Sequence, residues 1–138
     1  MFHIGYIESD PARQFAFEQI AVLLRARGFD NELRIYPRLT EAFVQLPQDR
    51  PDLVFVDVHA QTEHRPSGLD LVRELRQHPL CEKTTIVGLA DYAMPADRRA
   101  ALAAGCNDFL PRPLRYQTVE DVILLHQVLL SPDVRLSR

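Results

Sequence analysis

Residues 51–58, with the sequence PDLVFVDV, are the stretch that decides the fold. Leu53 to Val56 form a continuous apolar run that contains two valines and ends at Asp57. Such runs are typical of a central parallel strand that is buried on both faces of a sheet. The stretch therefore predicts an interior strand that presents one carboxylate, Asp57, at its carboxyl end.

The sequence on either side of this strand alternates between short apolar segments and helical patterns. Further strands are expected at residues 3–7, 32–36, 84–89 and 107–110. Because parallel strands need crossover connections, five strands alternating with five helices predict an α/β fold with a doubly wound parallel sheet.

The helix boundaries are indicated by capping and breaking residues. Asp10 followed by Pro11 predicts the start of the first helix, and Gly28 predicts its end. Thr40 is expected to cap the second helix. Later helices are expected after Gly68, from Met94-Pro95 to Gly105, and over residues 118–130.

Length and composition indicate one globular domain, which we place at residues 1–130, with residues 131–138 as a tail or the start of a linker. The 138 residues are 46% hydrophobic and carry a net charge of −3, and their basic residues are scattered, which argues against direct nucleic-acid binding. No apolar run is long enough to span a membrane and no signal peptide is evident, so a cytoplasmic location is expected. Cys81 and Cys106 have no metal-ligand spacing; free thiols are expected, although the sequence leaves a disulfide open.

The ends of the predicted strands select the candidate functional residues, because ligands bind beyond the carboxyl ends of the strands in open α/β sheets. Several carboxylates there would lie opposite one guanidinium, an arrangement suited to a hard divalent cation or a transferred phosphoryl group. The residues that follow the first, third, fourth and fifth strands are Glu8, Ser9, Asp10, Asp57, Ala90, Asp91 and Arg112.

Two segments also carry a family resemblance. Residues 51–57 with residues 66–69 (PSGL) resemble the third strand and following loop of response-regulator receiver domains. Residues 93–113 (AMPADRRAALAAGCNDFLPRP) closely resemble the fourth helix and fifth strand of these domains. The resemblance covers nearly the whole chain and implies the flavodoxin-like (βα)5 arrangement with helices on both faces. It also implies a signalling module of a two-component phosphorelay rather than an enzyme.

The resemblance assigns roles to the site residues. Asp57 is the phospho-acceptor position, served by a histidine kinase or a phosphotransfer protein as partner. Mg²⁺ is implied as cofactor, and its ligands would come from the side chains of Glu8, Ser9 and Asp57 and the backbone carbonyl of His59, with Asp10 as a further candidate. Receiver domains have a threonine or serine where this chain has Ala90, and a lysine where it has Arg112.

Several positions depart from the family pattern and weaken particular steps. Ser9 offers a hydroxyl in place of a metal-binding carboxylate, and Ala90 lacks the hydroxyl that would hold a phosphoryl oxygen. Arg112 keeps the charge but has a wide planar fork, which could pair bidentately with Asp57 and hold the site closed. Asp91 would repel an incoming phosphoryl group. The loop after Asp57, with the polar residues 61–65, is about three residues longer than usual connections.

These departures leave two functions open, a receiver that is phosphorylated on Asp57 and a pseudo-receiver that acts through protein contacts without phosphorylation. A third, a small flavodoxin-like enzyme or cofactor carrier, is disfavoured because no Gly-rich phosphate loop follows the first strand. The last helix carries more apolar residues than one face needs, from Val119 to Leu130, which suggests a partner contact. The resemblance implies that this contact is a homodimer through residues 93–130. The alternative is that these leucines are singly exposed.

Overall fold

A computed structural model describes residues 1–60, 67–92 and 94–130, with side chains in the last helix up to residue 125. Its five strands form one parallel sheet in the order β2-β1-β3-β4-β5. The predicted doubly wound parallel sheet is confirmed. The strands are β1 (Phe2–Ile7), β2 (Asn31–Tyr36), β3 (Leu53–Asp57), β4 (Thr85–Ala90) and β5 (Asp108–Pro111).

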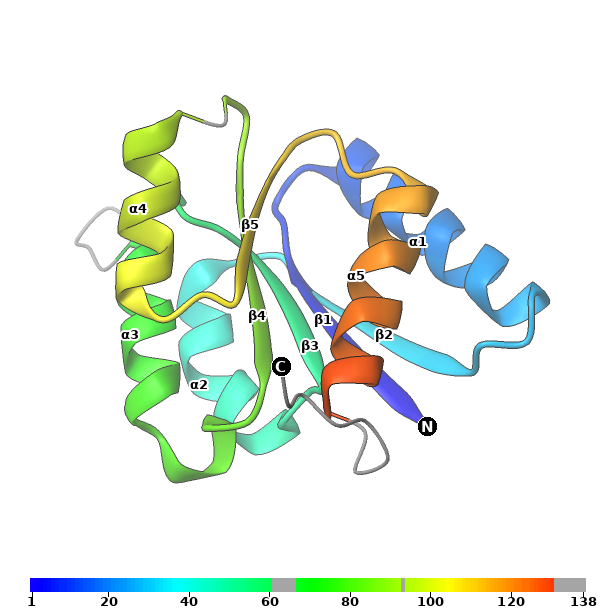
Figure 1. The fold of residues 1–138 in the computed structure, drawn as a ribbon, viewed down its shortest axis with the longest axis horizontal. Coiled ribbons are helices and arrows are strands. Elements are labelled where there is room, and N and C mark those ends of the chain that lie inside the picture. Colours follow the sequence, from blue (N-terminus) through cyan, green and yellow to red (C-terminus); the bar gives the residue numbers. More distant parts are fainter. Residues whose placement is uncertain (61–66, 93, 131–138) are drawn as a thin grey trace, which may run out of the picture.

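Helices cover both faces of this sheet, as predicted (Figure 1). In Figure 1, α1 and α5 lie on one side, and α2, α3 and α4 lie on the other. Two separate hydrophobic clusters correspond to these two faces. The helices are α1 (Pro11–Ala26), α2 (Leu39–Asp49), α3 (Gly68–Gln77), α4 (Pro95–Ala104) and α5 (Tyr116–Leu130), with a 3-10 turn, η1 (Pro79–Cys81), ahead of β4.

The strand predicted to be central is the middle strand of the sheet. β3 pairs with β1 on one side and with β4 on the other. Its residues from Leu53 to Val56 are each 0% exposed, and they alternate between the two clusters, so that Val54 packs on one face and Phe55 on the other. This packing fixes the end of β3, and with it Asp57, near the middle of the carboxyl edge.

The helix starts show where local signals were sufficient and where packing overrode them. The predicted cap of α1 is confirmed, because the Asp10 carboxylate accepts a hydrogen bond of 3.0 Å from the Arg13 backbone N–H. The predicted Thr40 cap is wrong: α2 begins at Leu39, and its N-cap residue, Arg38, makes no side-chain capping bond. Leu39 is buried in the core. Its packing, rather than a capping side chain, accounts for the earlier start.

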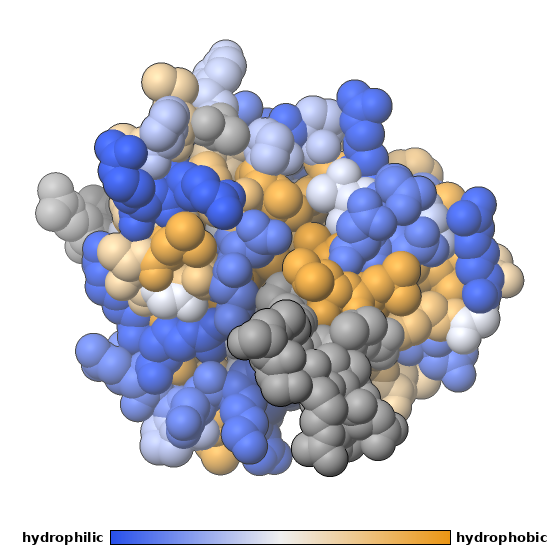
Figure 2. Space-filling model, viewed as in Figure 1, coloured by the Kyte–Doolittle hydropathy of each residue, from blue (hydrophilic) through white to orange (hydrophobic). Residues whose placement is uncertain are grey.

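The last helix carries exposed apolar side chains on its outer face. Val119, Val122 and Ile123 are buried, whereas Leu124 and Leu125 are 52% and 51% exposed. In Figure 2, orange surface gathers over the region of α5, while the surface over α3 and α4 is mostly blue. Among the described residues, no helix has the length and apolar character needed to cross a bilayer.

Both cysteines are free and buried, which confirms the thiol prediction. Burial raises the pKa of Cys106 from 9.0 to about 11, although the nearby Arg76 lowers it. We therefore expect Cys106 in a Cys81→Ala variant to react with a disulfide reagent at pH 8 roughly 100-fold more slowly in the folded protein than in urea, because the thiolate is the nucleophile. The pKa of Cys106 is higher in the folded protein than in the unfolded chain, so the protonated thiol favours the folded state. This contribution to the free energy of unfolding is fully present below pH 9 and is lost as the pH rises through 11. Equal labelling rates in buffer and in urea would contradict this expectation.

Candidate functional site

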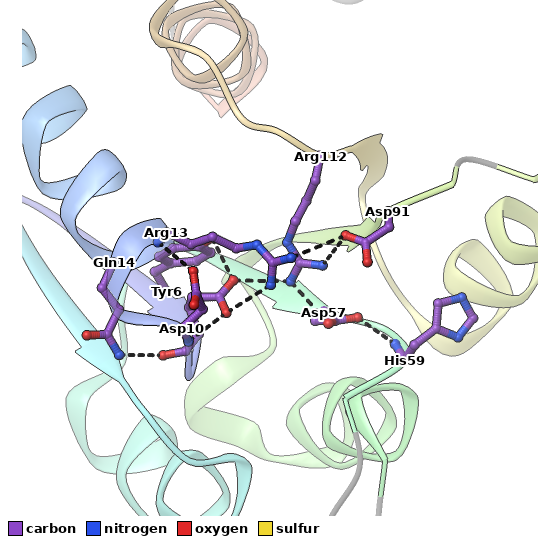
Figure 3. A network of polar contacts seen from close by, with 9 residues as sticks. Tyr6, Asp10, Arg13, Gln14, Asp57, His59, Asp91 and Arg112 are labelled. Atoms are coloured by element: carbon purple, nitrogen blue, oxygen red, sulfur yellow. Dashed lines mark hydrogen bonds and ion pairs between the residues drawn. The ribbon is translucent and has the colours of Figure 1, made fainter.

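The strand ends bring acidic and basic side chains together at one edge of the sheet (Figure 3). Asp57 is the last residue of β3, and it lies beside Leu89 of β4 in the parallel register. Glu8 directly follows β1, Asp91 follows β4, and Arg112 follows β5. The predicted meeting of Glu8, Asp57 and Arg112 is confirmed.

Arg112 is the centre of this cluster. Its Nη2 lies 3.3 Å from Glu8 Oε1 and 3.1 Å from Asp57 Oδ2, and its Nη1 lies 3.2 Å from Asp91 Oδ1. The Arg112 side chain is only 7% exposed. The sequence left open a bidentate pairing of Arg112 with Asp57; in the structure the fork is shared, because Glu8 and Asp91 contact it as well. One guanidinium thus contacts three carboxylates at once, and its single positive charge offsets part of their negative charge.

The surrounding carboxylates also set the protonation state of Arg112. Burial lowers the pKa of Arg112, but Asp57 and then Glu8 raise it by more, so that the pKa ends above its ordinary value. Arg112 is therefore a cation throughout the neutral pH range.

Glu8 is held in place by donors from β1 and α1. Its side chain is 4% exposed; Oε1 accepts a 3.0 Å hydrogen bond from the Tyr6 hydroxyl, and Oε2 accepts one of 3.0 Å from the Asp10 N–H. Arg13 Nη1 lies 3.5 Å from Oε2. Burial raises the pKa of the Tyr6 hydroxyl, and the charge of Glu8 raises it further, so Tyr6 remains a donor. Glu8 is therefore a buried carboxylate whose orientation toward Arg112 is fixed by these donors.

Asp57 is oriented in a similar way but remains accessible. Its Oδ1 accepts a 2.8 Å hydrogen bond from the His59 backbone N–H, while Oδ2 faces Arg112. Its side chain is 25% exposed. The His59 imidazole points away, with Nε2 3.3 Å from Asp97 Oδ1 at the start of α4 (Figure 3). Asp57 is thus a partly exposed carboxylate beside a buried cation.

The remaining predicted residues lie at the same edge with different surroundings. Ser9 is exposed, and the carboxylate of Asp10, which the sequence offered both as a helix cap and as a metal ligand, caps α1. Ala90 is 1% exposed at the end of β4, where it presents a methyl group. The polar loop 61–65 lies outside the described residues.

Three contributors were missed by sequence reasoning: Tyr6, Arg13 and Gln14. Arg13 lies 3.9 Å from Asp91 as well as near Glu8, and the Gln14 amide donates a 2.7 Å bond to the Glu8 carbonyl. Both belong to the first turn of α1, which begins at the same edge of the sheet as the acidic residues. This position was the available signal for them. Tyr6, inside an apolar strand, gave none.

A cavity of about 330 Å³ opens on the Arg13 side of the cluster. Phe17 and Ile20 of α1 form its apolar wall, and Tyr92, Pro113 and Leu114 from the loops after β4 and β5 also line it. Asp91 and Arg112 lie between this cavity and Asp57, at its polar end.

Comparisons with known proteins identify the family and the fold. Residues 10–124 match the response regulator receiver domain family. The phosphate regulon transcriptional regulatory protein PhoB from Rhizobium meliloti is 33% identical over 100 residues, which cover 70% of this chain and 42% of that protein. An uncharacterised 14.6 kDa protein from Leptolyngbya boryana is 35% identical over 80 residues, 58% of this chain and 59% of that protein. The matches thus span less than two thirds of these relatives.

Solved structures show the same fold. The receiver domain of a sensor histidine kinase from Pseudomonas aeruginosa, with a magnesium ion coordinated in its active-site cleft, matches with a TM-score of 0.74 and 22% identity over 90% of this chain and 95% of that one. A response regulator from Desulfuromonas acetoxidans matches with a TM-score of 0.78 and 16% identity over 95% and 100% of the two chains.

Proposed function

The chain belongs to the response regulator receiver domain family, and on this premise we propose that it accepts a phosphoryl group on Asp57. The observation that carries this proposal is the position of the Asp57 carboxylate. It ends the central strand, is 25% exposed, and lies 3.1 Å from a guanidinium that is itself buried. An anion that reacts there would meet a nucleophile and a fixed positive charge side by side.

The proposed reaction is transfer from a phosphohistidine of a histidine kinase or phosphotransfer protein. A bond forms between an Asp57 oxygen and phosphorus as the phosphorus–nitrogen bond breaks. The imidazole leaves as a neutral ring: the nitrogen that was bound to phosphorus keeps the electron pair of that bond, and the other ring nitrogen keeps the proton that it already carried. The His59 N–H orients Asp57, and Arg112 faces the charge that gathers on the phosphoryl oxygens.

Asp91 and Ala90 modify this chemistry. Asp91 Oδ1 already contacts Arg112 Nη1 at 3.2 Å, so a phosphoryl group that binds Arg112 competes with an internal carboxylate. Ala90 supplies no hydroxyl to the phosphoryl oxygens. We propose that both features make Asp57 a slow acceptor.

Magnesium requires a separate test of fit. A bound divalent cation would supply charge neutralisation at the phosphoryl oxygens. Within residues 1–60, 67–92 and 94–130, no three His, Cys, Asp or Glu side chains form a group that could hold a metal ion. The two carboxylates with family metal roles, Glu8 and Asp57, both contact the same Arg112 nitrogen. The side chains as they lie do not fit a divalent cation, and no step of the proposed reaction depends on one.

The second candidate function is a pseudo-receiver that binds partners without phosphorylation. It is favoured by one observation, that Glu8, Asp57 and Asp91 are all within 3.3 Å of Arg112 nitrogens, so that carboxylates of the chain itself already occupy the cation that a phosphoryl group would need. In either case we propose a homodimer through the 93–130 face, supported by the exposed Leu124 and Leu125.

The test is incubation with acetyl phosphate, followed by intact-mass measurement, together with NMR shifts on addition of beryllofluoride. We expect a mass increase of one phosphoryl group in the wild type and none in Asp57→Asn. Asp30→Asn, an exposed carboxylate in the turn before β2, is the matched control and is expected to behave as wild type. If the wild type shows neither an adduct nor Asp57-dependent shifts, the pseudo-receiver is the correct function.

A further inference from the structure

The Arg112 guanidinium lies between Glu8 and Asp57. A single nitrogen, Nη2, contacts Glu8 Oε1 and Asp57 Oδ2 at 3.3 and 3.1 Å. A positive charge bridges two carboxylates in this arrangement, which is what a divalent cation would do if it were bound by the same pair.

We propose that Arg112 takes the place of the divalent cation in this domain, so that the site neither binds Mg²⁺ at millimolar concentrations nor needs it to capture an anion at Asp57. The guanidinium is a built-in counter-ion for the acidic pair. The claim about cation binding stands on the contacts of Arg112, whereas its consequence for anion capture rests on the proposed function.

Displacement of the guanidinium by a metal ion is disfavoured by the burial of both partners. The Arg112 side chain is 7% exposed and that of Glu8 is 4% exposed, so in their present positions water solvates neither charge to any large extent. The Arg112 Nε is buried without a hydrogen-bond partner, so the nitrogens that contact Glu8, Asp57 and Asp91 are the ones that balance the burial of its charge. A metal ion bound between Glu8 and Asp57 would take these carboxylates from Arg112 and leave the buried guanidinium with fewer counter-charges.

The oxygen atoms that Mg²⁺ would need are also engaged. Both Glu8 oxygens accept hydrogen bonds, one from the Tyr6 hydroxyl and one from the Asp10 N–H. The Asp10 carboxylate caps α1 through the Arg13 N–H. Mg²⁺ demands near-octahedral oxygen ligands at about 2.0–2.1 Å. Only a rearrangement of these contacts would provide that geometry.

Arg13 strengthens the same pattern from the other side of Glu8. Its Nη1 lies 3.5 Å from Glu8 Oε2, and its Nη2 lies 3.9 Å from Asp91 Oδ1. Two guanidiniums therefore alternate with Glu8, Asp57 and Asp91 and offset most of their charge. The electrostatic attraction for a free dication is correspondingly small.

Amide NMR measures cation binding directly and does not depend on phosphorylation. Wild type and Arg112→Lys are titrated with MgCl₂ at constant ionic strength, and the amide shifts of Ser9, Asp10 and His59 are followed. We expect no saturable shifts in the wild type. Arg112→Lys is expected to show saturable shifts, with an Mg²⁺ affinity at least about tenfold above the upper limit that the titration sets for the wild type. The reason is that one compact ammonium cannot contact three carboxylates at once. Arg99→Lys, an exposed arginine of α4, is the matched control and is expected to respond as wild type.

The outcomes separate the two proposals. Saturable, millimolar Mg²⁺ binding by the wild type at these amides overturns the inference, as does an Arg112→Lys variant with a native spectrum and no gain in binding. Beryllofluoride binding is the second measurement. The beryllofluoride affinity of the wild type is expected to be the same within twofold in EDTA and in Mg²⁺. Arg112→Lys is expected to bind beryllofluoride only when Mg²⁺ is present. A wild type that captures no beryllofluoride under either condition counts against the proposed function, while the cation result stands on its own.

Discussion

Gly68→Ala is expected to destabilise the domain by about 3 kcal/mol, at the upper end of the range for overpacking, and to disturb Asp57. A Cβ atom at position 68 would lie 1.9 Å from the Asp57 carbonyl oxygen and 2.9 Å from its carbonyl carbon. Both neighbours are backbone atoms at the end of β3, so the contact cannot be relieved by a side-chain rotation. The start of α3 or the end of β3 must move, and the second movement displaces the proposed acceptor.

Urea unfolding and beryllofluoride-induced NMR shifts measure the two effects of this substitution. Ser67→Ala is the matched control one residue earlier. This substitution removes the capping box in which Ser67 Oγ accepts a hydrogen bond from the Asp70 N–H. It is expected to lower the free energy of unfolding by about 1 kcal/mol and to introduce no new contact with Asp57. If Gly68→Ala is no less stable than Ser67→Ala, the close packing of α3 against the end of β3 is not as described.

The fold could be predicted because its deciding signals are local in sequence. The apolar run of β3 is fully buried, as its composition indicated, and Asp10 with Pro11 begins α1. The errors occur where tertiary packing sets a boundary. α2 begins at Leu39 because this side chain enters the core, a contact that no sequence pattern around Thr40 encodes.

The candidate site was predictable in its membership but not in its pairing. Strand order places Glu8, Asp57 and Arg112 at one edge, so the topology alone brings them together. Which oxygen meets which nitrogen depends on side-chain rotamers and on competition among the carboxylates. Asp91 takes one arm of the Arg112 fork, and that contact excludes the bidentate pairing with Asp57. The hydrogen bond from Tyr6 to Glu8 could not be predicted either, because a tyrosine inside a buried strand is usually explained by packing alone.

Arg112→Gln is expected to destabilise the fold by about 3–5 kcal/mol, because it leaves a buried carboxylate without its main counter-charge. Glu8 is 4% exposed and would retain Arg13 as its nearest cation, at 3.5 Å from Oε2. Asp57 and Asp91 are more exposed and can regain water, so Glu8 dominates the effect. In urea this corresponds to a midpoint lowered by about 2 M, for a slope of roughly 2 kcal/mol per M.

A second substitution tests whether the cause is the charge of Glu8. The Glu8→Gln/Arg112→Gln double variant removes both charges and is expected to be more stable than Arg112→Gln by about 1–3 kcal/mol, because burying a neutral amide costs less than burying a carboxylate that has lost its counter-charge. Arg34→Gln is the control for loss of an arginine from an ion pair. Its Nη1 lies 2.7 Å from Asp49 Oδ2, but its side chain is 49% exposed, so a loss of at most about 1 kcal/mol is expected.

Burial, rather than distance, determines how much each of the two ion pairs is expected to contribute to stability. Arg34 has the shorter contact, 2.7 Å against 3.3 Å for Arg112 and Glu8, yet it is expected to contribute less. Water solvates both partners of an exposed pair when it is broken, whereas it cannot reach a carboxylate that is 4% exposed. If Arg34→Gln proves as destabilising as Arg112→Gln, or if the double variant recovers nothing, then the charge of Glu8 is not what Arg112 compensates.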